Sequence, residues 1–300
     1  MPVEVYWQKY YMKNKIDIAD QIEEWAGEKI KSRSSVSGGC IANSEVLTLK
    51  SGEQVFLKTG NAVSQMYYCE ANGLKELKKA NVIKIPEVYL VNDDFLLIEH
   101  VNQGSRDSRF FETFGHQFAE MHRITSSNFG FFEDNFIGAT PQINTSNGVS
   151  RYNWSEFYFQ NRLLYQFQLA EQNGYATTEL RRGIEHIKQV IDTLLEPVHE
   201  PPTLLHGDLW SGNFMIGANS IPVIIDPAVY YGNREADLAM TKLFGGFETR
   251  FYDAYYESYP LPDGYREREN LYILYHVLNH LNLFGQGYYH QALSLIESYY

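Results

Sequence analysis

The chain has 300 residues, of which 44% are hydrophobic and 15% aromatic, so it can bury a large core and is not a disordered polypeptide. Its formal net charge of −12 argues against general binding to nucleic acid, because that binding depends on Lys and Arg at the phosphates. The two cysteines, Cys40 and Cys69, are too few for a secreted disulfide framework. The chain also shows no signal-peptide pattern and no apolar run of transmembrane length, so we expect a cytoplasmic protein without a membrane partner.

The first hundred residues are predicted to form antiparallel strands with one inserted helix. Mixed isoleucines and charges predict an amphipathic helix over 15–31. Apolar runs on either side of turn residues predict one hairpin over 45–58 and a second over 88–99. The segment 64–80 between the hairpins has a helical pattern. These elements together make up a small antiparallel-sheet unit.

Residues 34–41 read Ser-Ser-Val-Ser-Gly-Gly-Cys-Ile and form a loop of small residues between two expected strands. Gly38, Gly39 and Cys40 allow the backbone to approach a phosphate closely, and successive N–H groups there can bind an anion. The loop lacks the spaced G-x-G-x-x-G pattern and could also be an ordinary turn. A further hypothesis makes Cys40 redox-sensitive, since a thiol beside such N–H groups ionises more easily; the alternative is a small residue that fills a tight loop.

Lys58 ends the apolar strand Val-Phe-Leu-Lys, from which it can reach the α- and β-phosphates of ATP. Glu70 follows twelve residues later on the expected helix and can hold that lysine. The alternative is that both are solvated surface side chains. Glu99, His100 and Val101 come after the second hairpin, and their backbone can hydrogen-bond the adenine.

From residue 103 onward the pattern becomes mainly helical, with short strands on either side of the segment 206–213. The polar stretch 144–150 is predicted to be a loop within this part of the chain. We therefore predict a nucleotide-binding N-lobe over 1–101 and a C-lobe with the catalytic and substrate sites over 102–300. The longer helices of the C-lobe are expected at 154–172, 178–196, 235–244, 248–258 and 267–283.

The most informative segment is His-Gly-Asp-Leu-Trp-Ser-Gly-Asn at 206–213, which precedes the strand end Ile-Ile-Asp-Pro at 224–227. Asp208 can orient or deprotonate an attacking hydroxyl, while Asn213 and Asp226 offer the hard oxygen donors that suit Mg²⁺. Each residue alone could belong to an ordinary turn or strand end. Their spacing is typical of a kinase catalytic loop followed by a metal loop, and it predicts phosphoryl transfer from ATP.

These residues resemble the fructosamine kinase (ketosamine 3-kinase) family, within the aminoglycoside phosphotransferase and protein-kinase-like group. The resemblance covers nearly the whole chain. Two segments distinguish the fructosamine kinase family from the wider group of small-molecule kinases. They are Leu-Trp-Ser-Gly after Asp208 and the later Phe-Gly-Gly-Phe. The segments that carry it are 38–41, 206–213, 226–228, 230–240 and 243–247.

The resemblance implies a two-lobed protein-kinase-like fold of the α+β class, with a small antiparallel-sheet N-lobe and a mostly helical C-lobe. It also implies ATP-dependent phosphorylation of the 3-hydroxyl of a ketosamine, which destabilises the sugar adduct and so leads to deglycation. By match of motif, Asp208 would be the catalytic base, Asn213 and Asp226 would bind Mg²⁺, and Lys58 paired with Glu70 would hold the phosphates. The sequence departs from the family at Asn233, where His is more frequent.

Trp210 is a candidate for the sugar pocket, because aromatic faces stack on sugars and attract cations; a core tryptophan is the alternative. His206 and Asp237 are predicted to hold the catalytic loop by hydrogen bonds. Two other functions stay open: a kinase for another cationic molecule such as an aminoglycoside or choline, and a nucleotide-binding regulator without catalysis. The preferred sugar, the amine (a free small molecule or a glycated lysine) and the oligomeric state are not determined by the sequence.

Overall fold

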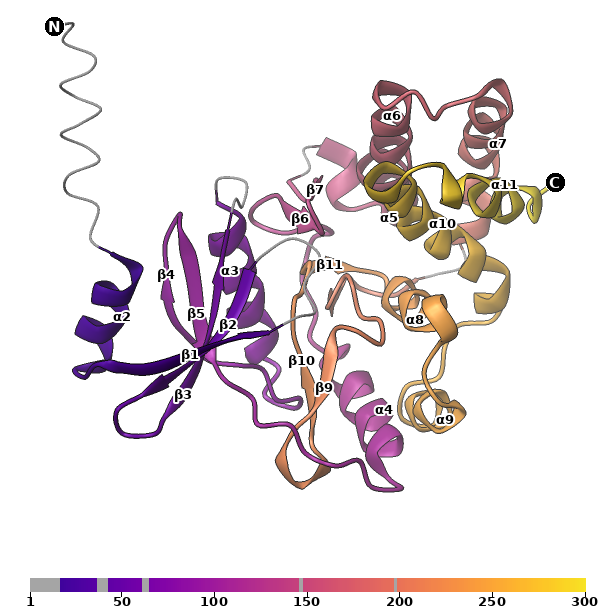
Figure 1. Ribbon diagram of the computed structural model, residues 1–300. Helices are drawn as coiled ribbons and strands as arrows, with labels where there is room; N and C mark the ends of the chain where they lie inside the picture. The colour runs from indigo at the N-terminus through magenta and orange to yellow at the C-terminus, as the bar shows by residue number, and fades with distance from the viewer. Residues whose placement is uncertain (1–16, 37–42, 61–64, 146–147, 197–198) are drawn as a thin grey trace, which may run out of the picture. The chain divides into compact units, whose positions relative to one another are not determined.

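The computed structural model forms two compact units (Figure 1). The first unit holds the chain up to Tyr68 together with Val88–His100, and the second holds Cys69–Glu87 and Val101–Tyr300. The residues that the structure describes are 17–36, 43–60, 65–145, 148–196 and 199–300.

The first unit is a five-stranded antiparallel sheet with the strand order β1-β2-β3-β5-β4 (Figure 1). The two predicted hairpins are confirmed as the pairs β2–β3 and β4–β5. Ile22, on helix α2 (Ile18–Ala26), packs with apolar residues of three strands to form the core of this unit. The strands are β1 (Ile30–Val36), β2 (Asn43–Leu49), β3 (Gln54–Thr59), β4 (Val88–Val91) and β5 (Phe95–Glu99).

The predicted helix over 15–31 is too long at its C-terminal end. Helix α2 begins after Asp17, whose side chain accepts a hydrogen bond from the backbone N–H of Ala19 at 3.2 Å, and it ends at Ala26. Residues from Ile30 onward instead pair with β2, so ladder hydrogen bonds replace helical ones there. The expected loop at 34–41 is shortened for the same reason, since β1 continues to Val36.

Helix α3 (Met66–Lys78) confirms the helix predicted over 64–80, and from Cys69 on it belongs to the second unit. Two side-chain contacts explain this grouping. Asn72 donates to Glu133 at 2.9 Å, and Glu76 accepts a hydrogen bond from the hydroxyl of Tyr231 at 2.9 Å. The division of the chain in the structure therefore passes through this helix as well as at residue 101.

The second unit is mainly helical, and the helices predicted from 154 onward are confirmed within a few residues at each end. The predicted helix over 154–172 contains a π-helical turn at Phe159–Leu164. The C-terminal helix α11 was not predicted. The α-helices are α4 (Phe110–Met121), α5 (Trp154–Tyr158), α6 (Tyr165–Gln172), α7 (Thr178–Leu195), α8 (Arg234–Lys242), α9 (Thr249–Ser258), α10 (Tyr265–Phe284) and α11 (Tyr289–Glu297).

Three short antiparallel strand pairs interrupt the helices of the second unit. They are β6 (Asn135–Ile137) with β7 (Thr140–Gln142), β8 (Thr203–Leu205) with β11 (Tyr230–Gly232), and β9 (Phe214–Ile216) with β10 (Pro222–Ile224). Short 3₁₀ turns lie at Gly148–Arg151, Ala218–Ser220, Leu243–Gly245 and Gln286–Tyr288. The strand pairs matter for function because they carry the segments around 206–226.

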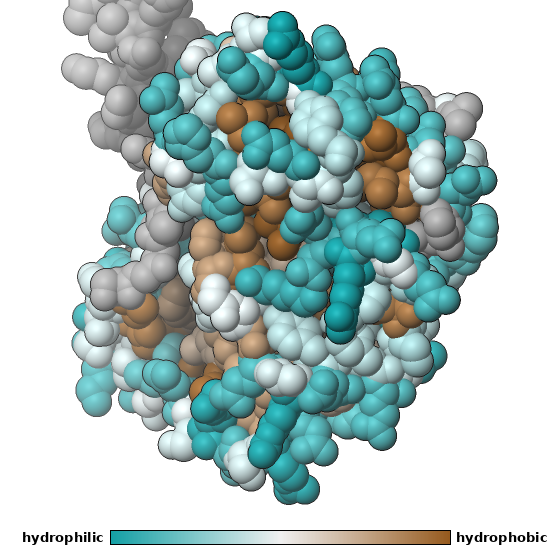
Figure 2. All heavy atoms as spheres, turned by 90° about the vertical axis from the view of Figure 1, so that its right-hand side faces the viewer, coloured by the Kyte–Doolittle hydropathy of each residue, from teal (hydrophilic) through white to brown (hydrophobic). Residues whose placement is uncertain are grey.

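The core of the second unit is aromatic. Phe114 and Phe118 of α4 lie within 6 Å of the ring of Phe251 on α9, measured between ring centroids at 5.2 and 5.7 Å. The face of the molecule shown in Figure 2 is mostly hydrophilic and carries several apolar patches. None of the described helices combines the length and the apolar character that a bilayer-spanning segment needs.

Candidate active site

The predicted catalytic loop begins directly after strand β8 and is held to the segment after Asp226 by the backbone. The carbonyl of His206 accepts a hydrogen bond from the N–H of Ala228 at 2.9 Å. Gly207 has φ +82°, and a Cβ at this position would lie 1.9 Å from the carbonyl oxygen of Ala228. Only glycine fits there, so the two segments can approach each other closely.

Three of the predicted site residues come together around this loop. The side-chain amide of Asn213 donates to the carbonyl oxygen of Asp208 at 2.8 Å and to its carboxylate at 3.1 Å. The backbone carbonyl of Asn213 accepts from the N–H of Ile225 at 3.0 Å, which places Asp226 beside the same cluster. Asp226 has φ +54°, a left-handed conformation that is uncommon outside glycine but tolerated by aspartate.

Asp208 is partly exposed, yet the surrounding protein removes much of the water from its carboxyl group. Burial raises the pKa of Asp208 well above its ordinary value, and the negative charge of Asp226 raises it further. The hydrogen bond from Asn213 acts in the opposite direction. Asp208 and Asp226 are therefore close enough for one carboxylate to destabilise the charge of the other.

His206 holds the catalytic loop by a hydrogen bond, as predicted, and also connects it to the segment that leads into Asp226. Its Nε2 lies 2.9 Å from the carbonyl oxygen of Ile225, and its Nδ1 lies 3.3 Å from the backbone N–H of Asp208. Burial lowers the pKa of His206, so the ring is neutral at neutral pH. Because a carbonyl can only accept and an N–H can only donate, the ring proton sits on Nε2.

Asp237, on helix α8, anchors the catalytic loop, also as predicted. Its carboxylate accepts the backbone N–H of His206 at 2.6 Å and that of Gly207 at 2.8 Å. His122 Nε2 lies 3.3 Å from the same carboxylate. Burial by itself would raise the pKa of Asp237. The hydrogen bond and the charge of His122, together with the contacts of the loop, outweigh burial and hold this pKa below its ordinary value.

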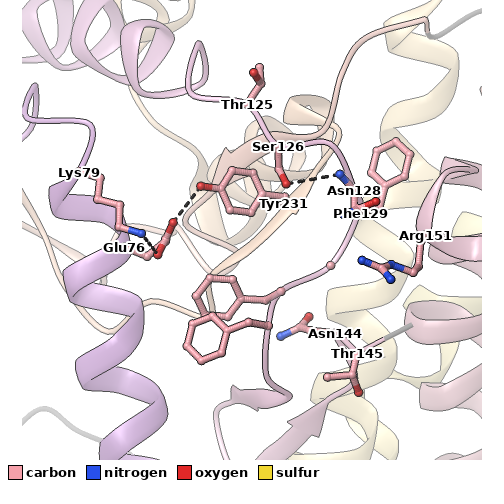
Figure 3. A pocket seen from close by; sticks show the side chains of 13 residues that line it. Glu76, Lys79, Thr125, Ser126, Asn128, Phe129, Asn144, Thr145, Arg151 and Tyr231 are labelled. Atoms are coloured by element: carbon pink, nitrogen blue, oxygen red, sulfur yellow. Dashed lines mark hydrogen bonds and ion pairs between the residues drawn. The ribbon is translucent and has the colours of Figure 1, made fainter. Parts of the chain in front are cut away.

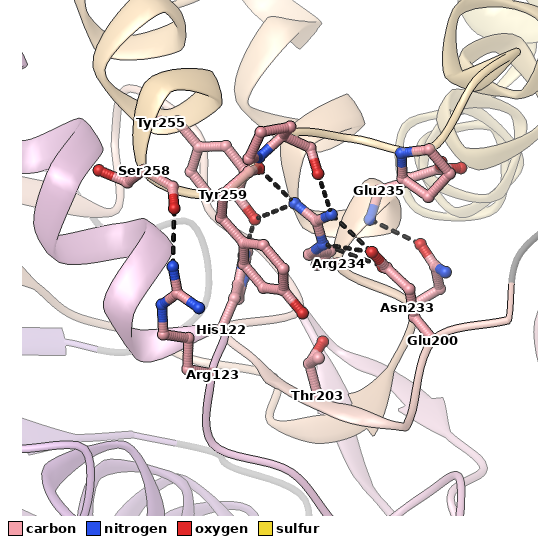
Figure 4. Close-up of polar contacts among 12 residues, drawn as sticks. His122, Arg123, Glu200, Thr203, Asn233, Arg234, Glu235, Tyr255, Ser258 and Tyr259 are labelled. Carbon is pink, nitrogen blue, oxygen red and sulfur yellow. Dashed lines mark hydrogen bonds and ion pairs between the residues drawn. The ribbon is translucent and has the colours of Figure 1, made fainter.

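His122, which contacts Asp237, is itself part of a chain of hydrogen bonds through Tyr255 to Arg234 (Figure 4). The Tyr255 hydroxyl lies 2.7 Å from His122 Nδ1 and 3.3 Å from the guanidinium of Arg234, which also forms a two-pronged ion pair with Glu200. A guanidinium can only donate, so the Tyr255 hydroxyl accepts from Arg234 and donates to His122. His122 then carries its proton on Nε2 and donates it to Asp237. This Arg234–Tyr255–His122 relay was not predicted, because its members are far apart in the sequence.

Trp210 lies beside the catalytic loop with its ring half-buried. A Cβ at Gly212 would lie 2.5 Å from the Trp210 ring, so glycine allows the ring to fold over the loop. The Trp210 ring meets Phe244 edge to face at 5.7 Å between centroids, and the Phe244 ring lies 4.9 Å from that of His280. Phe244 is 41% exposed and has φ +59°, which is strained for a bulky residue. The sequence indicated Trp210 but neither Phe244 nor His280 as part of one cluster.

The predicted nucleotide residues are divided between the two units. Lys58 lies on the central strand β3, opposite Ser44 of β2 and Leu96 of β5. Glu70 lies on helix α3 within the second unit.

The residues predicted to bind the adenine lie where the chain passes from one unit to the other. Glu99 ends β5, His100 is the last residue of the first unit, and Val101 begins the longest segment of the second. The proposed phosphate loop, Gly38, Gly39 and Cys40, lies outside the described residues.

The second unit also contains a polar cavity of about 540 Å³, apart from the catalytic loop (Figure 3). Asp208, Asn213 and Asp226 are not among its lining residues. Much of the charge on its wall is already paired, since Glu76 contacts both Lys79, at 2.7 Å, and the hydroxyl of Tyr231. We therefore place the candidate active site at the catalytic loop and not in this cavity.

The chain is similar to known proteins over most of its length. The model of the fructosamine kinase family matches residues 13–300. The chain is 39% identical, over 93% of its length and 87% of the relative's, to the chloroplastic protein-ribulosamine 3-kinase of Arabidopsis thaliana. A crystal structure of a fructosamine-3-kinase candidate from Thermobifida fusca superposes with a TM-score of 0.84 at 32% identity, covering 94% of this chain and 98% of that one.

A solved structure with much lower sequence identity has the same fold. The ADP-bound aminoglycoside phosphotransferase APH(2'')-Ib superposes with a TM-score of 0.61 at 14% identity, covering 94% of this chain and 98% of that one. At this identity the likeness concerns the fold alone. The predicted two-lobed, protein-kinase-like α+β fold is thereby confirmed.

Proposed function

The chain belongs to the fructosamine kinase family, and we propose that it transfers the γ-phosphoryl group of ATP to the 3-hydroxyl of a ketosamine, with Asp208 as the catalytic base. The observation that carries this proposal is the hydrogen-bonded cluster of Asp208, Asn213 and the residues that lead into Asp226. Phosphoryl transfer needs mainly positioning and charge neutralisation, and a rigid loop of this kind supplies the positioning.

Asp208 is suited to accept the proton of the attacking hydroxyl. Its raised pKa makes the carboxylate a stronger base than an exposed aspartate, and its partial exposure leaves it within reach of a substrate. The hydrogen bond from Asn213 fixes the direction of the carboxylate. Because the loop backbone is held by Asp237, the base would keep its place during turnover.

Asn213 and Asp226 fit the requirements of Mg²⁺, which prefers oxygen ligands and keeps part of its shell for water and phosphate. Asn213 uses its amide nitrogen on Asp208, which leaves its amide oxygen for a cation. Bound Mg²⁺ would neutralise charge on the phosphates and on the Asp208–Asp226 pair.

For the nucleotide we propose the residues that the sequence indicated. Lys58 would hold the α- and β-phosphates and Glu70 would pair with it. Gly38, Gly39 and Cys40 would cover the phosphates, and the backbone of Glu99, His100 and Val101 would bind the adenine. The support is their order along the chain in a confirmed family member.

For the sugar we propose the aromatic cluster of Trp210, Phe244 and His280. Trp210 follows Asp208 by two residues on the catalytic loop, and its half-buried ring meets the exposed ring of Phe244 edge to face. Aromatic faces bind the apolar faces of a sugar, and they attract the ammonium group of a ketosamine. The partner would be a free ketosamine or a glycated lysine of a protein, with no nucleic acid involved.

The test is an ATP-consumption assay with Mg²⁺ on fructosyl-lysine, ribulosyl-lysine and glycated protein, with kanamycin and choline alongside. We expect turnover on ketosamines, and the best sugar identifies the preferred substrate. Turnover on kanamycin or choline alone would support the kinase reaction but contradict a ketosamine as the substrate. ATP binding without turnover on any acceptor would favour a regulator.

A further inference from the structure

The hairpin of β6 and β7 places two amide side chains next to each other. Asn135 and Gln142 are directly opposite in the register of the two strands, so their side chains lie on the same face. Both are buried, with 4% and 1% of their surface exposed. The amide nitrogen of Gln142 donates to the amide oxygen of Asn135 at 2.9 Å.

Both amides also reach the backbone that follows Asp226. Asn135 donates to the carbonyl oxygen of Val229 at 2.7 Å, and Gln142 donates to that of Ala228 at 2.9 Å. On the other side, the hydroxyl of Tyr275 donates to the amide oxygen of Gln142 at 2.8 Å. Since backbone carbonyls can only accept, these contacts fix the orientation of both amides.

The residue two positions before the first of these held carbonyls is in a costly conformation. Asp226 has φ +54°, and such a backbone persists only when its surroundings determine it. Two residues later, Ala228 is fixed at both of its polar groups, because its N–H donates to His206 and its carbonyl accepts from Gln142. The ring of Tyr230 is in turn covered by the guanidinium of Arg162 at 4.1 Å.

We propose that Asn135, Gln142 and Tyr275 form a clamp that keeps Asp226 in the conformation required for binding Mg²⁺. The clamp residues are positioning residues, since they act on the metal site only through the backbone of Ala228 and Val229. This inference rests on the proposed role of Asp226 as a Mg²⁺ ligand. Contacts that hold a metal ligand in place without touching the metal change metal affinity by roughly 10- to 100-fold in other metal sites.

The experiment compares Gln142→Leu and Tyr275→Phe with the control Tyr272→Phe. Tyr272 lies three residues before Tyr275 on the same helix and is also buried, but its hydroxyl accepts from Trp154 and does not touch the clamp. Binding of Mn²⁺ to the protein with saturating ADP is followed by electron paramagnetic resonance, and binding of ADP without metal is followed by calorimetry. Urea unfolding of each variant checks that it is folded.

We expect both clamp variants to bind Mn²⁺ about tenfold more weakly, while metal-free ADP binding is unchanged and Tyr272→Phe binds Mn²⁺ normally. Unchanged Mn²⁺ affinity in folded clamp variants would overturn the clamp, and so would an equal loss in Tyr272→Phe.

Asp226→Asn separates this inference from the proposed function. If Asp226→Asn weakens Mn²⁺ binding but the clamp variants do not, the metal site stands and the clamp is wrong. If Asp226→Asn leaves Mn²⁺ binding unchanged, the proposed metal site itself fails. Should Gln142→Leu fail to fold, Tyr275→Phe still decides the question, because it removes a single hydroxyl group.

Discussion

The carboxylate of Asp237 accepts the backbone N–H of His206 at 2.6 Å, across 31 positions of the sequence. A second hydrogen bond, from Gly207 at 2.8 Å, uses the other oxygen of the same group. The start of helix α8 thereby fixes the backbone just before Asp208. The position of the proposed base thus depends on a residue that has no contact with the substrate in this proposal.

Asp237→Asn should lower both stability and turnover. The amide places an NH₂ group where one of the two N–H donors points, so a buried donor is left without an acceptor at a cost of about 1–3 kcal/mol. We expect the free energy of unfolding in urea to fall by about this amount. We also expect kcat to fall by a larger factor than the factor by which the KM for ATP changes. Asp253→Asn, at an exposed position on α9, is the control. Normal stability in Asp237→Asn would contradict the anchoring role.

Tyr255→Phe tests the Arg234–Tyr255–His122 relay. The variant leaves His122 Nδ1 and one guanidinium N–H without their shared partner, so the proton of His122 is no longer directed to Asp237. We expect a lower kcat with an unchanged KM for ATP, and a loss of about 1–3 kcal/mol in unfolding free energy. Tyr256→Phe, on the same helix, provides the comparison, and equal kinetics of the two variants would argue against the relay.

Asp208→Asn should abolish most of the turnover while nucleotide binding persists. The amide keeps the size of the side chain but cannot accept the proton, and general base catalysis typically contributes about 10²–10⁴-fold. The measurement is kcat with the best ketosamine, together with the affinity for ATP by calorimetry. A variant with near-normal kcat would refute the role of Asp208 as base.

The same substitution should stabilise the protein at neutral pH. The pKa of Asp208 is raised in the folded state, so between its ordinary value near 4 and the raised value the folded protein holds a proton that the unfolded chain has released. Stability of the natural protein therefore falls as pH rises through this window, and Asp208→Asn lacks that loss. In metal-free buffer, the melting temperature of the variant should match the natural one at low pH and exceed it at pH 7. A constant difference across pH would contradict the raised pKa.

Phe244→Ala should weaken binding of the sugar substrate selectively. Loss of the exposed ring removes a face that stacks on the ketosamine, worth about 0.5–1.5 kcal/mol. We expect the KM for the ketosamine to rise about three- to tenfold and the KM for ATP to stay unchanged. Phe132→Ala is the matched control, because Phe132 is 68% exposed but lines the separate polar cavity. A rise in KM of the same size in both variants would exclude a specific sugar contact.

The sequence was sufficient to predict the helices and strands that depend on a local pattern of residues. The two hairpins of the first unit and most helices of the second follow from apolar spacing and turn residues, and the roles of His206 and Asp237 in holding the loop follow from the motif. The N-terminal helix was predicted too long because Ile30 continues its apolar pattern, whereas the pairing of this residue with β2 is a contact between segments that are separated in the sequence.

The hydrogen bonds that hold the Asp226 segment could not be predicted either, because they also join segments that are distant in the sequence. Gln142 and Tyr275 are 133 residues apart, and nothing in either local sequence indicates that the two meet. The aromatic cluster is similar, since Phe244 and His280 meet only after α8 and α10 have packed. The roles of individual residues toward ATP, Mg²⁺ and the sugar remain predictions.

The π-helical turn at Phe159–Leu164 limits how this chain can be shortened. It holds one residue more per turn than an α-helix, and within it Arg162 is fully buried, donating to the carbonyl of Ile143 at 2.6 Å and lying over the Tyr230 ring. Deleting a single residue within this turn would restore a regular helix with little rotation of the flanking segments, because the wider turn has already absorbed one extra residue. The shortened helix would keep its ends in register but would move Arg162 away from the carbonyl of Ile143 and from the Tyr230 ring, so the support of this part of the core is what the deletion removes.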